Sequence, residues 1–210
     1  MGFRLRILSW WTPVWLQGKA LDELAHSTIN GLEKILNEYS PLENNAQGRK
    51  YDINEKIILK GNLDEKRRIM TTTHNELVET LISILGREEA ILKGRKAMYN
   101  EGLLLGQRFK WLLGVGDDLQ DLITAARIMY QVLGIDFVVE EKGQNEMIMR
   151  VNHCSLAHYY DLNTCKVLSA VDEGVVQGLN PDIQMMFTER ITQGHDHCLA
   201  SLKMILPMEE

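Results

Sequence analysis

The spacing of apolar residues changes near residue 135, and this change limits what the chain can fold into. Before that point, apolar residues recur at the interval of a helix. After it, runs such as 137–140 and 147–151 have the alternating character of a half-buried strand. The pattern predicts a single domain with a mostly helical part, residues 1–134, followed by an α+β part, residues 135–206.

The helical part is divided by residues that cap or break helices. The expected helices run from Gly18 or Lys19 to Tyr39, from Asn62 to Gly86, from Glu88 to about Leu113, and from Asp117 or Asp118 to Leu133. Asn62 followed by Glu65 has the form of a capping box. Pro41 ends the first helix, and the polar residues 41–54 predict a surface loop.

The α+β part has the pattern of two β-hairpins joined by a helix. The first hairpin turns at residues 142–145, and the second contains strands expected at Gln184–Thr192 and His197–Ile205. Between the hairpins we expect a helix from Thr164, its predicted cap, to about Gln177. The predicted fold is therefore α+β, with an N-terminal helical layer packed on a small four-stranded antiparallel sheet.

Two glycines lie inside the third predicted helix. Gly102 and Gly106 are four residues apart, so they share one helix face. Each costs about 1 kcal/mol of helix stability relative to alanine. We expect them to allow the backbone of another element to approach closely.

Composition argues against some classes of partner. The chain has 210 residues, a net charge of −6 and a pI of about 5.6, whereas nucleic-acid binders usually carry a basic face. It contains three cysteines, an odd number that favours free thiols in a reducing compartment. We therefore expect a cytoplasmic protein that binds a small-molecule substrate and no nucleic acid.

The N-terminal residues are basic and then apolar, with Trp10, Trp11 and Trp15 close together. Arg6 and Pro13 bracket a run too short for a signal peptide, and no apolar run is long enough to span a membrane. We interpret the tryptophans as core or subunit-contact residues, which predicts no membrane partner and allows a homo-oligomer.

All three cysteines lie in the last third of the chain. Cys154 follows the second strand, Cys165 opens the helix, and Cys198 lies early on the last strand, on its inward side. A helix N-terminus lowers the pKa of a thiol, so Cys165 is a candidate nucleophile or metal ligand. The alternative is that these residues pack as small hydrophobic side chains, as free cysteines often do.

The turn before the last strand, His195-Asp196-His197-Cys198, contains two imidazoles, a carboxylate and a thiol. Imidazole and thiolate groups bind zinc and iron, so a Cys/His metal site is one interpretation. The chain has no C-x-x-C motif, and a polar hairpin turn on the surface is the other interpretation. The sequence does not assign a metal.

Asp172 lies seven residues after Cys165, about two helical turns, so both side chains lie on one face of the predicted helix. A thiolate and a carboxylate on the same wall are suited to nucleophilic and general acid–base catalysis. The alternative is that Asp172 and Glu173 form an exposed acidic pair.

These residues resemble the family of L-2-amino-thiazoline-4-carboxylic acid hydrolases. The resemblance rests on Cys154 in a C-x-x-A context, Cys165 followed by Val171-Asp172-Glu-Gly, Gly178-Leu-Asn-Pro, and Ile191-Thr-Gln-Gly-His-Asp-His-Cys198. This chain has Cys154-Ser155 where family members often have Cys-Pro. A weaker similarity is to small-molecule-binding domains of the 4-vinyl-reductase type. Their first terminal cysteine would fall near Arg190, and this chain has no cysteine there.

The resemblance implies an enzyme that acts on a C–N or C–S bond of a small, amino-acid-derived cyclic or amidine-like compound. The implied catalytic residues are Cys154, Cys165, Asp172, Cys198 and His195, and the implied substrate-binding residues are His153, Glu173 and His197. In this interpretation water adds to a C=N carbon and the ring opens. The rival interpretations are a non-catalytic ligand-binding or sensory domain and a structural zinc or iron site.

Overall fold

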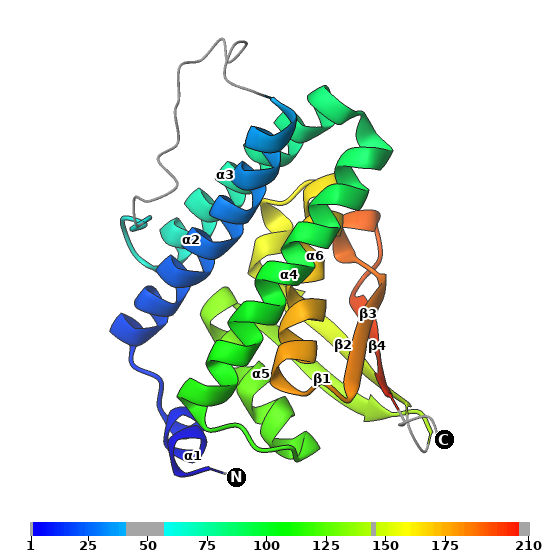
Figure 1. Ribbon diagram of the computed structural model, residues 1–210. Coiled ribbons are helices and arrows are strands. Elements are labelled where there is room, and N and C mark those ends of the chain that lie inside the picture. Colours follow the sequence, from blue (N-terminus) through cyan, green and yellow to red (C-terminus); the bar gives the residue numbers. More distant parts are fainter. Residues whose placement is uncertain (1, 41–56, 144–145, 206–210) are drawn as a thin grey trace.

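Helices form the N-terminal part of the molecule and a sheet forms most of the C-terminal part. The computed structural model describes residues 2–40, 57–143 and 146–205 (Figure 1). Its α-helices are α1 (Phe3–Trp10), α2 (Val14–Tyr39), α3 (Leu63–Leu85), α4 (Arg87–Leu113), α5 (Leu119–Leu133) and α6 (Leu162–Leu179). Its strands are β1 (Ile135–Glu141), β2 (Glu146–Cys154), β3 (Ile183–Glu189) and β4 (Cys198–Met204), and two short 3₁₀ helices are η1 (Ser155–His158) and η2 (Ile191–Gln193).

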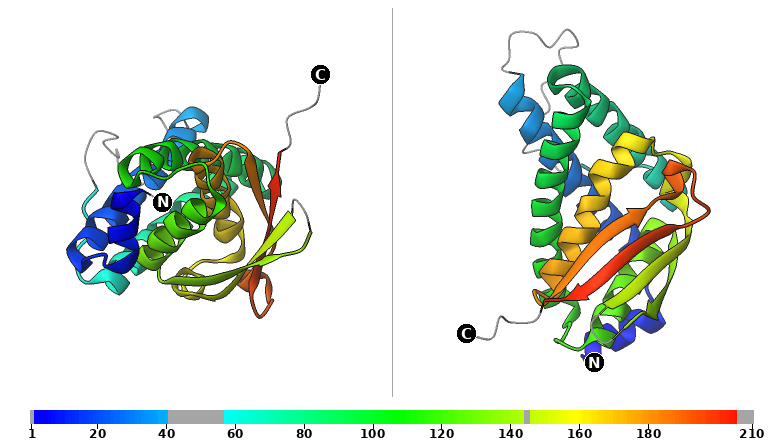
Figure 2. Two further views of the ribbon diagram at one scale, coloured as in Figure 1. Left: turned by 90° about the horizontal axis from the view of Figure 1, so that it is seen from below. Right: turned by 90° about the vertical axis from the view of Figure 1, so that its right-hand side faces the viewer.

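The sheet is antiparallel throughout, in the order β1-β2-β4-β3. Its inner face carries buried side chains from every strand: Phe137, Met147, Met149, Val151, Ile183, Met185, Cys198, Ala200 and Leu202. Helices α5 and α6 lie against this face, and the other helices lie beyond them (Figure 2). This arrangement confirms the predicted α+β fold, in which a helical layer covers a four-stranded sheet.

Strand β3 is shorter than the sequence predicted. It ends at Glu189, whereas we expected it to continue to Thr192. The pairing register shifts between Phe187 and Glu189, and the chain then turns into η2. The shift lets Arg190 turn its side chain inward, where its Nε and Nη2 atoms bond Ser169 Oγ at 3.2 and 3.0 Å.

Helices α4 and α6 cross with their backbones in close contact, as the glycine spacing predicted. A Cβ atom on Gly102 would collide with the carbonyl oxygen of Val171, and one on Gly174 would collide with that of Tyr99. Gly106 and Gly178 meet one turn further along. Because α6 carries Cys165 and Asp172, this crossing fixes the position of the helix that presents the candidate site.

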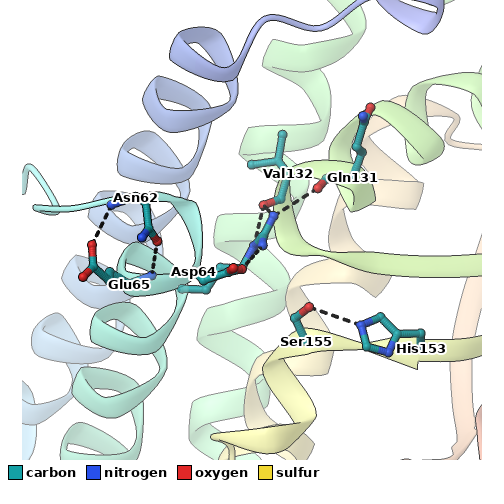
Figure 3. Close-up of polar contacts among 8 residues, drawn as sticks. Asn62, Asp64, Glu65, Gln131, Val132, His153 and Ser155 are labelled. Atoms are coloured by element: carbon teal, nitrogen blue, oxygen red, sulfur yellow. Dashed lines mark hydrogen bonds and ion pairs between the residues drawn. The ribbon is translucent and has the colours of Figure 1, made fainter.

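The capping box at α3 is confirmed. The Asn62 side chain accepts from the Glu65 N–H at 3.0 Å, and the Glu65 carboxylate accepts from the Asn62 N–H at 2.8 Å (Figure 3). One turn later, the buried Arg67 guanidinium donates to the carbonyls of Gln131 and Val132 at the end of α5. This contact ties α3 to the point where the chain enters β1.

Helix α6 begins and ends at residues other than those predicted. Its N-cap is Asp161, whose carboxylate accepts from the Thr164 N–H at 3.3 Å, and Thr164 is buried within the first turn. Both residue types are good caps, and the one that precedes the helix is Asp161. The helix continues to Leu179 rather than Gln177. The predicted loop at 41–54 lies outside the described residues.

The N-terminal tryptophans are not core residues. Trp10, Trp11 and Trp15 are 93%, 69% and 64% exposed, because α1, which the sequence did not predict, buries Leu5 instead. Pro13 separates α1 from α2 and precedes the first turn of α2. The subunit-contact role of the tryptophans stays a prediction. None of the helices in the described ranges is both long and apolar enough to cross a membrane.

Candidate functional site

A cavity of about 380 Å³ lies between the helices and the inner face of the sheet. Every described helix and strand contributes to its wall, from Leu8 in α1 to Leu202 in β4. The wall is mostly aliphatic and aromatic. Within the described part of the chain, Asp172 is the only carboxylate that lines it, and Arg190 is the only cationic side chain. The volume is in the range of small-molecule binding sites, which are typically about 300–1,000 Å³.

The three predicted thiols and the predicted carboxylate line this cavity together. Cys154 is placed by the end of β2, Cys198 by the start of β4, where it pairs with Val151, and Cys165 and Asp172 by two turns of α6. Strand β4 buries Cys198 on its inner side, as the alternating pattern predicted. The structure therefore brings together four side chains that are up to 44 positions apart in the sequence, from Cys154 to Cys198.

Burial keeps the thiols in their protonated form. It raises the pKa of Cys154 to about 12 and also raises the pKa values of Cys165 and Cys198. The expectation that the helix N-terminus lowers the pKa of Cys165 is not met, because desolvation outweighs it. The first-turn N–H groups of α6 are also occupied, since Thr164 N donates to the Asp161 side chain and Cys165 N to the Asp161 carbonyl.

Asp172 has a pKa suited to proton transfer near neutrality. Burial in the apolar cavity raises the pKa of its carboxyl group to about 7, and the negative charge of Glu173 adds to the rise. A hydrogen bond from Tyr130 and the charge of Arg190 act in the opposite direction. Tyr130 is itself buried and lines the cavity, so it holds the carboxyl group from the α5 side.

Arg190 lines the cavity, although no sequence pattern marks it as a site residue. Its side chain is buried at 7% exposure, and its guanidinium lies 5.5 Å from the centre of the Phe187 ring. Ser169 is its hydrogen-bond partner, and no ion pair to Arg190 is present among the described residues. The nearby Glu173 carboxylate is instead paired with Arg95 at 2.6 Å. No local sequence signal distinguishes Arg190, because a charged residue just after a strand is usually exposed.

His74 was also missed, and it lies in a buried hydrogen-bonded chain at the cavity wall. Its Nε2 lies 2.8 Å from Thr28 Oγ1, and its Nδ1 lies 2.8 Å from the Tyr160 hydroxyl. Thr28 donates its own proton to the Leu24 carbonyl at 2.8 Å, which assigns the His74 proton to Nε2 and makes Nδ1 an acceptor for Tyr160. Burial lowers the pKa of His74 to about 3, so the ring is neutral.

The other predicted site residues lie away from the cavity wall. His195 and His197 lie 3.5 and 3.7 Å from the Glu189 carboxylate at the turn before β4. His153 borders a shallow surface hollow and lies 3.4 Å from the Ser155 hydroxyl (Figure 3). Glu173 is buried in its pair with Arg95. Their predicted catalytic and substrate-binding roles stay predictions.

Comparison with known proteins places the chain in a family. A family model described as L-2-amino-thiazoline-4-carboxylic acid hydrolase matches residues 66–201. The chain belongs to this family. The matched stretch begins in α3 and ends in β4, so this member of the hydrolase family has its thiols, Asp172 and Arg190 inside the match. The resemblance predicted from the sequence is confirmed. No curated protein matches the chain.

Two solved structures are similar in fold to this hydrolase-family chain. Subunit 3 of a trafficking protein particle complex from Naegleria fowleri, covalently bound to palmitic acid, is 16% identical with a TM-score of 0.54, covering 69% of this chain and 98% of that chain. The phenol-responsive sensory domain of the transcription activator PoxR with phenol is 15% identical with a TM-score of 0.48, covering 83% and 89%. At these identities the first likeness concerns the fold alone.

The zinc or iron site suggested by the Cys/His turn has no matching cluster in the part of the chain that the structure describes. There, no group of three or more His, Cys, Asp or Glu side chains is arranged to hold a metal ion. The metal hypothesis stays a prediction, which metal analysis of the purified hydrolase-family protein can check.

Proposed function

We propose that this member of the L-2-amino-thiazoline-4-carboxylic acid hydrolase family hydrolyses a C–N bond of a small cyclic, amidine-like compound bound in the cavity. The observation that carries the proposal is Asp172, a lone carboxyl group in an apolar cavity with a pKa of about 7. A catalytic acid or base is most effective when its pKa lies near the working pH. The family match supports the reaction class.

In the proposed reaction, Asp172 transfers protons and water is the nucleophile. The ionised carboxylate accepts a proton from water as the water oxygen bonds to the C=N carbon. It then returns the proton to the ring nitrogen, the C–N bond breaks, and the remaining proton of the water also reaches that nitrogen. The oxygen is left as a carbonyl and the nitrogen as an amine. Water is favoured over a thiolate because burial raises the pKa values of all three thiols.

Asp172→Asn tests the proposal with L-2-amino-thiazoline-4-carboxylic acid as substrate. The variant keeps the shape of the side chain but cannot transfer protons, so we expect the rate of ring opening to fall by about 100- to 10,000-fold. Mass spectrometry detects the reaction as the gain of one water. Asp182→Asn is the matched control, because Asp182 is exposed and does not line the cavity. Unchanged turnover by Asp172→Asn would refute the role of this carboxyl group.

The pH profile gives an independent readout of the same role. A base must be ionised, so the rate of hydrolysis should rise with pH and level off above the pKa of Asp172, which is about 7. Serine variants of Cys154, Cys165 and Cys198 should keep this inflection. If one serine variant instead abolishes turnover, that thiol takes part in the reaction.

A second candidate function is non-catalytic binding of a small molecule. The apolar wall and the protonated thiols favour it, because both are features of a ligand pocket rather than of a nucleophilic site. It predicts that wild-type protein binds an apolar ligand without converting it, and that Asp172→Asn binds the same ligand equally well. Turnover of any cyclic amidine-like compound by wild-type protein would exclude it.

A further inference from the structure

Arg190 combines burial with the lack of a charged partner among the described residues. Its side chain is 7% exposed, and it lines the cavity. A buried guanidinium usually pairs with a carboxylate, since an isolated buried charge is costly. Two carboxylates lie near it, and neither forms that pair: Glu173 bonds Arg95 at 2.6 Å, and Asp172 forms no ion pair among the described residues.

The orientation of the guanidinium is fixed by one residue. Ser169 Oγ accepts from Nε at 3.2 Å and from Nη2 at 3.0 Å, while its own proton goes to the Lys166 carbonyl at 3.1 Å. These bonds occupy the Nε–Nη2 edge of the guanidinium. The Nη1 end makes no hydrogen bond to any described residue, so it is available to a ligand.

Other hydrogen-bond donors surround the same end of the cavity. Thr192 Oγ1 is buried without a hydrogen bond of normal geometry in the described part of the chain, and it lies beside the Cys165 thiol. Cys198 also lines this end, where its sulfur accepts from the Ile191 N–H at 3.3 Å. The Arg190 guanidinium, the Thr192 hydroxyl and the neutral thiols form a donor-rich region, with the Asp172 carboxyl group beside it. The rest of the wall is mostly apolar.

We propose that Arg190 binds the carboxylate of the ligand, and that the ligand is an organic acid with an apolar body that fills the rest of the cavity. The planar carboxylate matches the free end of the guanidinium, which can bind both of its oxygens. The inference rests on the cavity being the substrate site of the proposed function. It adds that the preferred compound has a larger apolar body than the test substrate, L-2-amino-thiazoline-4-carboxylic acid.

Octanoate and octanamide test the anion preference, because they have the same shape and differ in charge. Wild-type protein at pH 7.5, titrated in a calorimeter, should bind octanoate about 10- to 100-fold more tightly than octanamide, the range expected for a hydrogen bond to a charged group. Along hexanoate, octanoate and decanoate, affinity should rise about 4-fold per added CH₂ group. Equal affinity for the acid and the amide would overturn the proposal.

Arg190→Gln should abolish the preference for octanoate and leave the affinity for octanamide within about 2-fold of wild type. Arg150→Gln is the matched control, since Arg150 pairs with Glu140 on the outer face of the sheet at 2.6 Å. An Arg190→Gln protein that still prefers octanoate would contradict the assignment.

A crystal structure of the wild-type octanoate complex decides the matter even if Arg190→Gln fails to fold. A carboxylate within hydrogen-bonding distance of Nη1 is expected, and a carboxylate bound elsewhere overturns the proposal. None of these measurements involves turnover. Failure here therefore leaves hydrolysis through Asp172 standing, and failure of hydrolysis leaves the anion preference standing.

Discussion

His74 and Asp172 are two titratable residues at the cavity wall whose pKa values shift in opposite directions. His74 is kept neutral, with a pKa of about 3, and Asp172 is kept partly protonated, with a pKa of about 7. Both shifts arise mainly from burial, which disfavours the charged form of either group. For His74 the result is a fixed proton on Nε2 and an acceptor at Nδ1, which orients the Tyr160 hydroxyl at the cavity wall. We infer that His74 is a positioning residue.

The pH dependence of the stability of a His74→Asn variant tests whether His74 is neutral in the folded protein. Between about pH 3 and 6.5 the unfolded chain protonates His74 and the folded chain does not, so stability must rise with pH in this window. We expect the difference in unfolding free energy, wild type minus variant, to rise by about 1.4 kcal/mol per pH unit below pH 6.5 and to be flat above pH 7.5. Urea unfolding at a series of pH values measures it.

Wild type must be compared with His74→Asn because the pKa shift of Asp172 changes the unfolding free energy with pH in the opposite direction. The folded chain holds the Asp172 proton between about pH 3.8 and 7 while the unfolded chain loses it, so this group lowers stability as pH rises. The same contribution occurs in both proteins and cancels in the difference. A difference that does not change with pH would show that His74 is charged in the folded state.

At the scale of elements, the crossing of α4 and α6 determines where the site residues lie. Gly102 and Gly106 of α4 face Gly174 and Gly178 of α6 so closely that a methyl group on Gly102 or Gly174 would meet backbone atoms of the other helix. A helix that bears Asp172 and Cys165 can therefore not shift toward α4, and it cannot accept a larger side chain at the contact.

Gly102→Ala should destabilise the protein despite the better helix propensity of alanine. The new methyl group forces the helices apart, and overpacking of this kind costs about 1–3 kcal/mol. Gly18→Ala in α2 is the control, because its nearest neighbour would be the Lys66 Nζ at 3.7 Å. We expect the control to be more stable by up to about 1 kcal/mol. Denaturant unfolding measures both, and equal effects of the two substitutions would contradict the packing argument.

Local patterns in the sequence were sufficient to predict the order of the α-helices and strands from α2 onward. The Asn62 capping box, the glycine pair in α4 and the alternation in β4 each depend on residues a few positions apart, and each is confirmed. The predicted cap at Thr164 was wrong because Asp161, three residues earlier, is an equally good cap and the sequence does not rank them.

The cavity could be predicted only in part. Cys154, Cys165, Asp172 and Cys198 were found because they are chemically rare and lie in one segment. His74 and Arg190 were not found, because their roles depend on contacts with Thr28, Tyr160 and Ser169. Single-sequence patterns contain no information about partners that are far apart in the chain. The exposure of Trp10 was missed for the same reason.

At the scale of the whole molecule, every element gives part of its apolar surface to the cavity wall instead of to close packing. Such a space lacks the dispersion contacts of a filled core, which lowers stability by about 24 cal/mol per Å³. A cavity retained at this cost is typical of a binding site, where stability and function compete. Filling the cavity should therefore preserve the stability of the protein while it weakens ligand binding.

Ala126→Leu adds bulk where Ala126 of α5 lines the cavity. We expect the free energy of unfolding to stay within about 1 kcal/mol of wild type or to rise, because the added carbons occupy empty apolar space. Octanoate should bind at least about 10-fold more weakly, because it competes for the same space. Gln120→Leu, at an exposed position on the same helix, should change neither quantity. If Ala126→Leu binds octanoate as tightly as wild type, octanoate lies elsewhere and the assignment of Arg190 to its binding site fails.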